Sequence, residues 1–474
     1  MSSAGDTGSA GGPCAEATDA VLRAVAAETG VPVTELSVID RRRLSGGASR
    51  LTWMLRVGSP RADDLAEVVL QQERPGSAGA NLAMTEQANL VAAAGEAGVP
   101  VPRVLASGRA EDGAGFAVLS RLPGESLPGR IHSDPAFHAV RGQLAGQVGE
   151  ACARIHSIDP GALPGGSTPE PLESMVRLLD ALGEPHPALE LGLCWLADNR
   201  PDDRRTAVVH GDLRMGNLLI DPGGLRGVLD WELAHLGSPV EDLGWFCARA
   251  WRFGSPQRAG GVGSVAQLLE GYERGGGERP EPAELDWWEA YACLRWGLIC
   301  VLQASVHLSG AHRSVELAAI GRRVAECEED LLQIVSGASP SEPPTATSEH
   351  PVGSQGRPTA SELLEAVSEH LDDHRGTLEG SDAFHMRVAR NVVLMVQREV
   401  ELGDELELRH RQRLESLGMA DEAALASAIR DRRVDPSEPA LVEAVRAGVR
   451  DRLAVSHPGY WLGDEPRSGS SGAS

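Results

Sequence analysis

The chain has 474 residues, enough for two or three domains that each bury a core of their own. Acidic residues outnumber basic ones by 68 to 44, and the formal net charge of -24 disfavours nucleic acid or an anionic membrane as the main partner. Lysine is absent, so all 44 of these basic residues are arginine. The seven cysteines form no C-x-x-C pair, which disfavours a zinc site or a disulfide framework and predicts buried thiols in a reducing compartment.

The beginning of the chain, residues 1–18, is rich in Gly, Ser and Ala and is predicted to be disordered. It contains neither the basic nor the apolar region of a secretory signal. No apolar run approaches the length of a membrane span. We therefore expect a cytoplasmic protein without a membrane partner.

The next segment, residues 19–122, has the pattern of a small antiparallel sheet with two helices. Apolar residues recur at helical spacing over 19–30 and over 81–98, and both stretches end in glycine. Short apolar runs bounded by turn residues are typical of strands. The five expected strands lie before and after residue 45 within 37–57, over 67–72, over 101–107 and over 116–122.

A glycine-containing turn separates the first two of these strands. Its backbone N–H groups could approach phosphate oxygens closely, because glycine has no Cβ. A plain hairpin has the same pattern, and only the position of the turn ahead of the motif at 208–231 favours a nucleotide-binding loop. The residues of the turn are Ser45, Gly46, Gly47, Ala48 and Ser49.

Three longer helices are predicted over 137–158, 286–308 and 312–334, since apolar residues recur there every three or four positions. The tryptophans of the second helix are expected to be core residues rather than cofactor contacts. His156, at the end of the first helix, is expected to be structural.

A polar cluster lies in residues 208–231, which read VVHGDLRMGNLLIDPGGLRGVLDW. Asp212, Asn217 and Asp230 have the order and spacing that kinases use for a catalytic base and two magnesium ligands. The flanking apolar runs predict strand, loop, strand, turn and strand, which puts the polar ends on one rim. A carboxylate within reach of a hydroxyl can take its proton, which suits Asp212. Amide and carboxylate oxygens suit magnesium, a hard cation that keeps several waters.

An ordinary β-hairpin with solvated carboxylates would contain the same residue types, and D-x-x-x-x-N alone occurs often by chance. The combination of HGD, the asparagine and the later apolar-Asp-Trp run disfavours that alternative. We expect His210 to hold the loop through hydrogen bonds rather than to ionise in catalysis.

The motif resembles the catalytic segment of the aminoglycoside phosphotransferase and choline kinase superfamily, which reads HGD-x-x-x-x-N. The version here, HGDLRMGNLLID followed by LDWELAHLGSPVEDLGW, is most similar to the branch associated with acyl-CoA dehydrogenases. The resemblance covers residues 20–335. It implies a bilobal, protein-kinase-like α+β fold, with a small antiparallel-sheet N-lobe over 19–122 and a mainly helical C-lobe over 123–335. It also implies Mg2+ and ATP as cofactors, with GTP as the alternative donor.

The resemblance implies a basic residue on the third strand, where this chain has Gln71. Arg74, Arg50 or Arg43 could substitute, because a guanidinium binds phosphate bidentately, but the sequence does not choose among them. In kinases a glutamate on the following helix pairs with the strand lysine, and Glu86 matches its position. Without that lysine, Glu86 would meet an arginine or reach magnesium through water; a solvated surface carboxylate is the alternative.

Two further sites follow from the resemblance. The backbone of Ser120, Arg121 and Leu122, where the lobes join, is expected to hydrogen-bond the adenine edge. Asp242 matches a family position that supports the catalytic loop.

The acceptor site is expected partly on helices over 172–182 and 187–199. This region has no dense cluster of carboxylates, which disfavours the polycationic aminoglycosides as substrates. The resemblance suggests a small-molecule hydroxyl instead, such as that of a hydroxyacyl thioester. Four residues near the motif are candidates for contact with the acceptor: Arg214, Trp231, Glu232 and His235.

The composition changes beyond residue 335. Residues 336–357 are rich in Ser, Pro, Thr and Glu and are predicted to form a linker. Residues 358–463 have helical periodicity, predict an all-α domain and resemble an uncharacterised domain found beside such kinases. His370, His374 and His385 are expected to be surface or packing residues, and residues 464–474 are predicted to be disordered.

The leading hypothesis is an ATP- and magnesium-dependent kinase that phosphorylates a hydroxyl of a small molecule. The alternative is a nucleotide-binding regulatory or scaffold protein that keeps the fold but catalyses little. Gln71 favours this alternative, whereas the intact catalytic and metal-binding residues oppose it. HGD and Asp-Trp-Glu stand where protein kinases have HRD and Asp-Phe-Gly, so nothing indicates a peptide substrate. The sequence does not indicate the oligomeric state.

Overall fold

The computed structural model describes residues 12–44, 50–73, 82–163, 170–202, 205–337, 358–376, 378 and 380–460. The chain divides into two compact units, each built from several segments. The N-terminal unit comprises Met1–Ser167, Arg205–Asp242 and Ala266–Glu278, and the helical unit comprises Thr168–Arg204, Leu243–Val265 and Arg279–Ser474.

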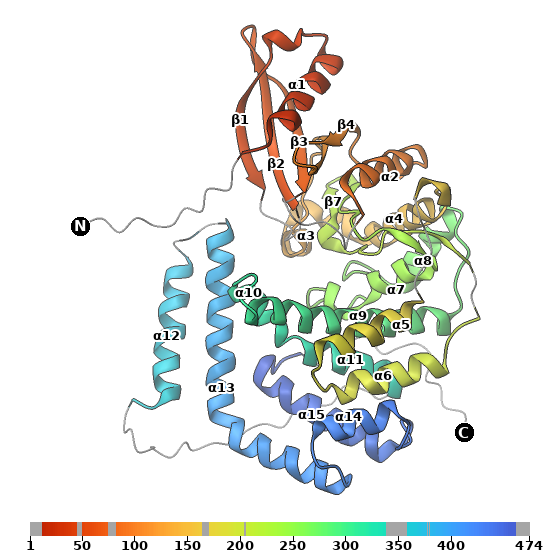
Figure 1. The fold of residues 1–474 in the computed structure, drawn as a ribbon, viewed down its shortest axis with the longest axis vertical. Helices are drawn as coiled ribbons and strands as arrows, with labels where there is room; N and C mark the ends of the chain where they lie inside the picture. The colour runs from red at the N-terminus through yellow and green to blue at the C-terminus, as the bar shows by residue number, and fades with distance from the viewer. Residues whose placement is uncertain are drawn as a thin grey trace. The chain divides into compact units, whose positions relative to one another are not determined.

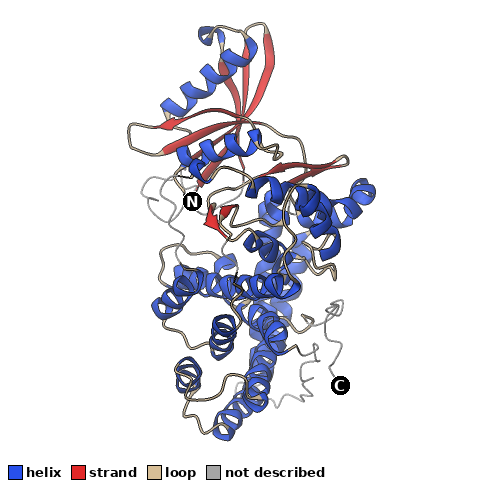
Figure 2. Ribbon diagram, turned by 90° about the vertical axis from the view of Figure 1, so that its right-hand side faces the viewer, coloured by secondary structure: helices blue, strands red, loops and turns tan. Residues whose placement is uncertain are grey.

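The predicted five-stranded antiparallel sheet is confirmed and forms the first part of the N-terminal unit (Figures 1 and 2). Its strands lie in the order β1-β2-β3-β5-β4. The register pairs Arg50 with Glu73 and Thr52 with Gln71, so these four side chains share one face of the sheet. The strands are β1 (Ser37–Leu44), β2 (Arg50–Ser59), β3 (Ala62–Glu73), β4 (Val104–Arg109) and β5 (Gly115–Ser120).

A helix covers each face of this sheet. α1 (Ala15–Thr29) begins earlier than the predicted residue 19, and Cys14 caps it by accepting a hydrogen bond from the Ala17 N–H. Alternate strand residues such as Trp53 and Leu70 pack under α1. The opposite face carries Ala117 and packs under α2 (Met84–Glu96). Because the side chains alternate, every second residue of β2 and β3 is directed toward α2.

The rest of the N-terminal unit consists of helices and two small sheets. The paired strands are β6 (Ala207–Val209) with β9 (His235–Gly237), and β7 (Leu218–Asp221) with β8 (Gly224–Val228). The helices are α3 (Pro128–Ser133), α4 (His138–His156) and α8 (Val265–Arg274), with short 3-10 turns at Val33–Glu35, Pro135–Phe137, Pro160–Ala162 and Met215–Asn217.

Helices α4 and α8 touch backbone to backbone. A Cβ on Gly149 would lie 2.0 Å from the Leu268 carbonyl oxygen, and one on Gly271 would lie 1.9 Å from the Gly146 oxygen. Only glycine therefore permits this approach. The contact packs the middle of α4 closely against α8, and His156 lies at the C-terminal end of α4.

The helical unit confirms the expectation of a mainly helical remainder with an all-helical C-terminal part. Its helices are α5 (Pro171–Leu182), α6 (Pro187–Asp198), α9 (Pro282–Leu308), α10 (Val315–Gly321), α11 (Val324–Ser336), α12 (Ala360–Arg375), α13 (Gly380–Ser416), α14 (Glu422–Arg430) and α15 (Pro439–Ser456), with a 3-10 turn at Arg249–Trp251. α7 (Val240–Cys247) begins at the end of the N-terminal unit's second segment.

The C-terminal helices share a core with earlier helices of the same unit. Leu191 on α6 and Leu332 on α11 belong to one buried cluster with Leu425, Ile429 and Val449 of α14 and α15. α12 and α13 form an antiparallel hairpin, on which His370, His374 and His385 are exposed.

Helix α11 buries four carboxylates against α15 and the residues that follow it. Arg446 Nη2 lies 2.8 Å from Glu329 Oε1, and Arg452 Nη2 lies 2.6 Å from Glu328 Oε2. The remaining pairs are His457 Nδ1 with Glu326 Oε1 at 3.0 Å and Tyr460 Oη with Asp330 Oδ2 at 2.6 Å. Each of these buried acids therefore has a partner on α15 or in the residues that follow it.

Among the helices that the structure describes, one is long and apolar enough to cross a membrane by length and composition alone. α9 contains an 18-residue window of mean hydropathy 1.2, of which 44% is buried in the structure. A core helix of a soluble protein passes the same test, and α9 packs against α5, α6, α10 and α11.

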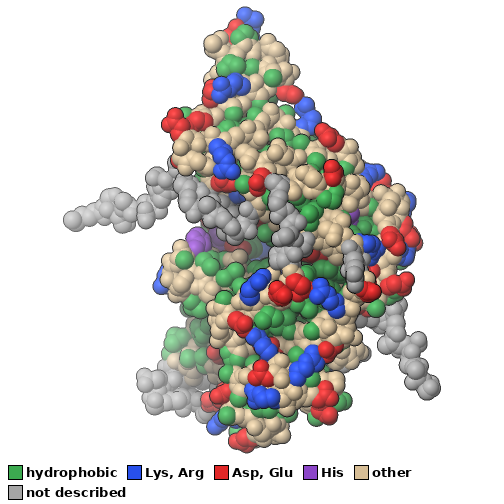
Figure 3. Space-filling model, turned by 45° about the vertical axis from the view of Figure 1, so that its right-hand side comes forward, with side chains coloured by type: hydrophobic (Ala, Val, Ile, Leu, Met, Phe, Trp, Pro, Cys, Tyr) green, Lys and Arg blue, Asp and Glu red, His purple; other side chains and the backbone are tan. Residues whose placement is uncertain are grey.

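On the face drawn in Figure 3, arginines and acidic side chains are interspersed.

Candidate active site

The predicted catalytic loop, residues 210–217, is held between the two small sheets of the N-terminal unit. It leaves β6 at Val209 and enters β7 at Leu218, and both residues are buried. Gly211 has a φ of 76°, and a Cβ there would lie 2.3 Å from the Leu233 carbonyl oxygen. The glycine of HGD is therefore required by the backbone.

The Asp212 carboxylate is held by two residues of the same loop. Asn217 Nδ2 donates to Asp212 Oδ2 at 2.7 Å and to the Asp212 carbonyl oxygen at 2.9 Å. Arg214 Nε lies 3.1 Å from each carboxylate oxygen. Both bonds from Asn217 use its amide nitrogen, which leaves the amide oxygen to accept a cation. The structure thus brings the predicted base and the first predicted metal ligand together.

Asp230 lies beside this pair, because the Leu229 N–H donates to the Asn217 carbonyl oxygen at 2.8 Å. Its φ of 65° is uncommon outside glycine, and such outliers cluster at functional sites. Burial raises the pKa of Asp230, as do the charges of Glu232 and Asp212, while the charge of Arg50 opposes them. A divalent cation bound here would offset the repulsion among these carboxylates.

His210 connects the loop to the Asp230 segment, as expected. Its Nδ1 accepts from the Asp212 N–H at 3.2 Å, and its Nε2 lies 2.9 Å from the Leu229 carbonyl oxygen. Both ring nitrogens therefore bond to backbone groups of the site. His210 acts by positioning the two segments.

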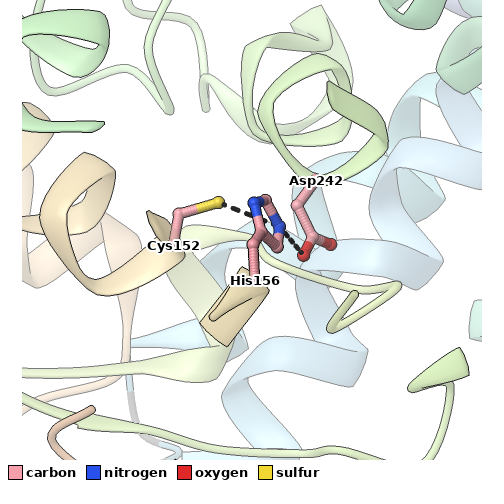
Figure 4. A group of neighbouring side chains, drawn as sticks. All are labelled: Cys152, His156 and Asp242. Atoms are coloured by element: carbon pink, nitrogen blue, oxygen red, sulfur yellow. Dashed lines mark hydrogen bonds and ion pairs between the residues drawn. The ribbon is translucent and has the colours of Figure 1, made fainter. Parts of the chain in front are cut away.

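Asp242 supports the first residues of the loop through hydrogen bonds. One carboxylate oxygen accepts from the His210 N–H at 2.8 Å and the other from the Gly211 N–H at 2.9 Å. His156 Nε2 lies 3.1 Å from Asp242 Oδ2 (Figure 4). The other ring nitrogen of His156, Nδ1, lies 2.8 Å from the Tyr272 hydroxyl. Burial would raise the pKa of Asp242, but the hydrogen bond and charge of His156 hold it below its ordinary value. Tyr272 gave no signal in the sequence, because it reaches the site from a distant helix.

Cys152, His156 and Asp242 lie close enough to be tested as a metal site, with potential ligand atoms within 4.8 Å of one another (Figure 4). However, both oxygens of Asp242 already accept backbone N–H groups. His156 uses both ring nitrogens as well. The cluster therefore serves to hold the HGD turn.

Among the three candidate replacements for the strand basic residue, Arg50 is the one that the structure places at the site. Its side chain is 8% exposed, Nη1 donates to Gln87 Oε1 on α2, and Nε lies 3.4 Å from Glu232 Oε2. Arg43 is exposed on β1, and Arg74 lies outside the described residues.

Glu86 is placed differently from the kinase glutamate. Its Oε2 accepts from the Ala83 N–H at 3.3 Å and so caps the start of α2. The helix residue that contacts an arginine is its neighbour, Gln87. Sequence reasoning missed Gln87, because an amide does not match the expected acidic partner.

The predicted nucleotide-contacting segments are only partly described. Residues 45–49 lie outside the described residues. At the end of β5, the Ser120 N–H already donates to the Arg103 carbonyl oxygen at 2.9 Å, so it is engaged within the protein. Arg121 forms an ion pair with Glu67, and just beyond Leu122 the backbone of Glu125 exchanges hydrogen bonds with Ile220 of β7. Adenine contact by the backbone of Ser120, Arg121 and Leu122 stays a prediction.

The four candidate acceptor residues lie in different environments. Arg214 contacts Asp212, and His235 Nε2 lies 3.1 Å from Glu241 Oε2. Glu232 faces Arg50. Trp231 is only 2% exposed, donates to the Val228 carbonyl oxygen and packs on the His210 ring, so its expected place in the pocket lining is corrected to a core position.

Sheet, loop and supporting aspartate together place the protein in the class of kinase-like phosphotransferases. The chain belongs to the phosphotransferase enzyme family, whose profile matches residues 40–288, more than half of its 474 residues. A second profile, described as a domain of unknown function, matches residues 376–460.

Curated relatives combine a similar segment with much additional chain. Mouse acyl-CoA dehydrogenase family member 10 is 31% identical over 179 residues, which span 35% of this chain and 16% of that protein. Chicken acyl-CoA dehydrogenase family member 11 is 29% identical over 235 residues, or 46% of this chain and 29% of that protein. The matches thus span less than a third of these relatives.

One solved structure shows the same fold. It comes from Ralstonia eutropha, and its assignment as an aminoglycoside phosphotransferase is provisional. The TM-score is 0.53 with 23% sequence identity, and the match covers 69% of this chain and 99% of that one.

Proposed function

We propose that the protein is an ATP- and magnesium-dependent phosphotransferase that phosphorylates a hydroxyl group of a small-molecule metabolite. The observation that carries the proposal is the Asp212 carboxylate, held by the amide nitrogen of Asn217 with Asp230 beside the same loop. Family membership supports the reaction class. The arrangement offers a base and two oxygen ligands within one compact unit.

The donor set fits magnesium. The Asn217 amide oxygen and the Asp230 carboxylate are hard oxygen ligands, and the excess of carboxylates around Asp230 favours a divalent cation. Bound with ATP, the cation would supply a polarised phosphoryl group. The chain itself orients the acceptor: Asp212 accepts the hydroxyl hydrogen bond and takes the proton onto a carboxylate oxygen. Arg214 and Asn217 keep that carboxylate in one orientation.

The acceptor we propose is a hydroxyacyl thioester or a related hydroxylated metabolite. Similarity to acyl-CoA dehydrogenase family members supports this class. A polycationic acceptor finds no support in the carboxylates of α5 and α6, because they already pair with arginines. Glu190 and Asp180 pair with Arg430, and Asp198 pairs with Arg432.

The test is Asp212→Asn, which keeps the shape of the side chain and removes the base. We expect γ-phosphate transfer to fall by about 100- to 10,000-fold. Magnesium-ATP affinity, measured by calorimetry, should stay within a few-fold of the native value. The acceptor panel would contain hydroxyacyl thioesters, amino sugars and small alcohols.

The matched control is Asp221→Asn, a carboxylate on the nearby β7–β8 hairpin whose partner is Arg226. This variant should transfer phosphate at the native rate. Native-rate transfer by the Asp212 variant would show that the base has been misassigned.

Gln71 favours a second candidate, a nucleotide-binding regulatory or scaffold protein. The same experiment separates the two. Magnesium-dependent ATP binding without transfer to any acceptor in the panel would favour the regulatory function, and acceptor-stimulated transfer would exclude it.

A further inference from the structure

The kinase-like site has its positive charge in an unexpected place. β3 carries Gln71 where the family resemblance implies a basic residue, and the register places Gln71 opposite Thr52. Arg50 stands one pair further along, opposite Glu73, on the same face of the sheet. Arg50 and Gln71 are therefore diagonal neighbours, a separation that a long side chain can span.

The Arg50 side chain is buried where an unpaired guanidinium would be costly, since it is only 8% exposed. Its partners are the Gln87 amide oxygen and, at 3.4 Å, the Glu232 carboxylate. Gln87 is neutral, so it orients the guanidinium without cancelling its charge. Glu232 lies two residues beyond Asp230, which puts Arg50 next to the proposed magnesium ligand.

Two carboxylates of β3 and α2 already accept backbone hydrogen bonds. Glu73, the cross-strand partner of Arg50, accepts from the N–H groups of Met84 and Gly115 at 2.7 and 2.8 Å. Glu86 caps α2. The arginine is thus held at the site by Gln87 and Glu232, while these two carboxylates serve the backbone.

We propose that Arg50 is the phosphate-anchoring cation of this protein, moved from the third strand to the second, with Gln87 as its orienting partner. This inference rests on the proposed function, since it assigns a role toward the nucleotide. A guanidinium offers a planar fork that can bind a phosphate oxygen pair and keep its bond to Gln87. Arg50 thus supplies the positive charge that the neutral Gln71 does not.

The test exchanges the two side chains. Arg50→Gln should weaken magnesium-ATP binding by about 10- to 100-fold, the range expected for the loss of a charge-assisted hydrogen bond. Adenosine affinity should not change. The double variant Arg50→Gln with Gln71→Arg should recover most of the ATP affinity, because the cation returns to the diagonal position on β3.

Calorimetry with ATP, ADP and adenosine, together with thermal unfolding without nucleotide, gives readouts that do not depend on turnover. Arg43→Gln, on exposed β1, is the matched control and should leave every affinity unchanged. If Arg50→Gln does not fold, Arg50→Lys replaces it. The lysine keeps the charge without the fork, so ATP affinity should fall by about 3- to 10-fold and adenosine affinity should stay the same.

The outcomes separate the two proposals. A native protein that binds no nucleotide would overturn the proposed function. A native protein that binds ATP while the Arg50 variant binds it equally well would overturn only the role of Arg50. An equal loss of ATP and adenosine affinity would also overturn it, since it would mean that Arg50 only supports the fold.

Discussion

At the scale of single residues, the site depends on a carboxylate that would not touch the substrate. Asp242 is fully buried and accepts hydrogen bonds from two consecutive backbone N–H groups and from His156. It thereby fixes the turn that carries Asp212. The tight turn at Gly211 and the left-handed backbone at Asp230 persist only where surrounding contacts impose them.

Asp242→Asn should therefore damage stability and activity together. The asparagine would direct an N–H2 group toward N–H donors that now bond to a carboxylate oxygen. The expected loss is about 3 kcal/mol in the free energy of unfolding, measured by urea titration. Asp221→Asn should leave the free energy of unfolding nearly unchanged, because the Asp221–Arg226 ion pair is screened by water. Equal stability of the two variants would contradict the supporting role of Asp242.

The residues of the HGD motif were predictable, because their spacing lies within one loop. Asp212 and Asn217 are five positions apart, and the structure joins them by a hydrogen bond. Arg50 could not be chosen from the sequence, since its importance depends on the β2–β3 register and on a contact with α2. Trp231 was placed wrongly because a tryptophan beside a catalytic residue has the same local pattern whether it is buried or lines a pocket.

At the scale of elements, α11 shows a helix whose polar face is buried. Burial would raise the pKa of Glu328, but the charge of Arg452 and the hydrogen bond from His186 hold it below its ordinary value. Glu329 pairs with Arg446, and both side chains are 2% exposed. Such a pair makes each member dependent on the other.

Removing one member of the Glu329–Arg446 pair should cost more than removing both. Arg446→Met leaves a buried carboxylate without its cation, and we expect a loss of about 3 to 5 kcal/mol in the free energy of unfolding. The double variant Glu329→Met with Arg446→Met should lie within about 1 to 2 kcal/mol of the native protein. Urea titration of the two single variants and the double variant gives the coupling energy, and additive losses would show that the pair is not coupled.

Helical periodicity predicted most helices but missed a break. Residues 312–334 were expected to form one helix, whereas the structure has α10 and α11 with a turn between them. α10 ends at Gly321, where a Cβ would lie 2.6 Å from the Cβ of Ala304 on α9. Glycine is a poor helix former, and here it permits a close helix contact, so a tertiary contact decides where the helix stops.

At the scale of the whole molecule, the C-terminal segment is part of a core. α14 and α15 bury Ile429 and Val449 against Leu191 and Leu332 of α6 and α11. The domain boundaries drawn from composition stay a prediction. Local patterns could show that this segment is helical, but not which surface it covers, because contacts over more than a hundred residues leave no periodicity.

A chain ending after Gly337 should therefore be much less stable than the full protein. Several buried side chains would lose their packing, each worth about 2 to 5 kcal/mol, and the α11 acids would lose the partners that α15 and the residues after it supply. We expect the midpoint of thermal unfolding to fall by more than about 10 °C, or the product to aggregate. A chain ending after Tyr460 keeps α14, α15 and the residues that pair with the α11 acids, and should unfold at a clearly higher temperature than the shorter chain. An unchanged midpoint in the shorter chain would contradict this account.

The buried carboxylates of α11 also limit when this helix can be packed during synthesis on the ribosome. Glu329 is synthesised 117 residues before Arg446, its partner in the finished protein. At about 5 to 20 residues per second, Arg446 is synthesised roughly 6 to 23 seconds after Glu329. During that interval no other segment can pack over Glu329 on α11 without burying a carboxylate that lacks its cationic partner. The face of α11 that carries Glu329 can therefore be covered without an uncompensated charge only after Arg446 on α15 has been synthesised.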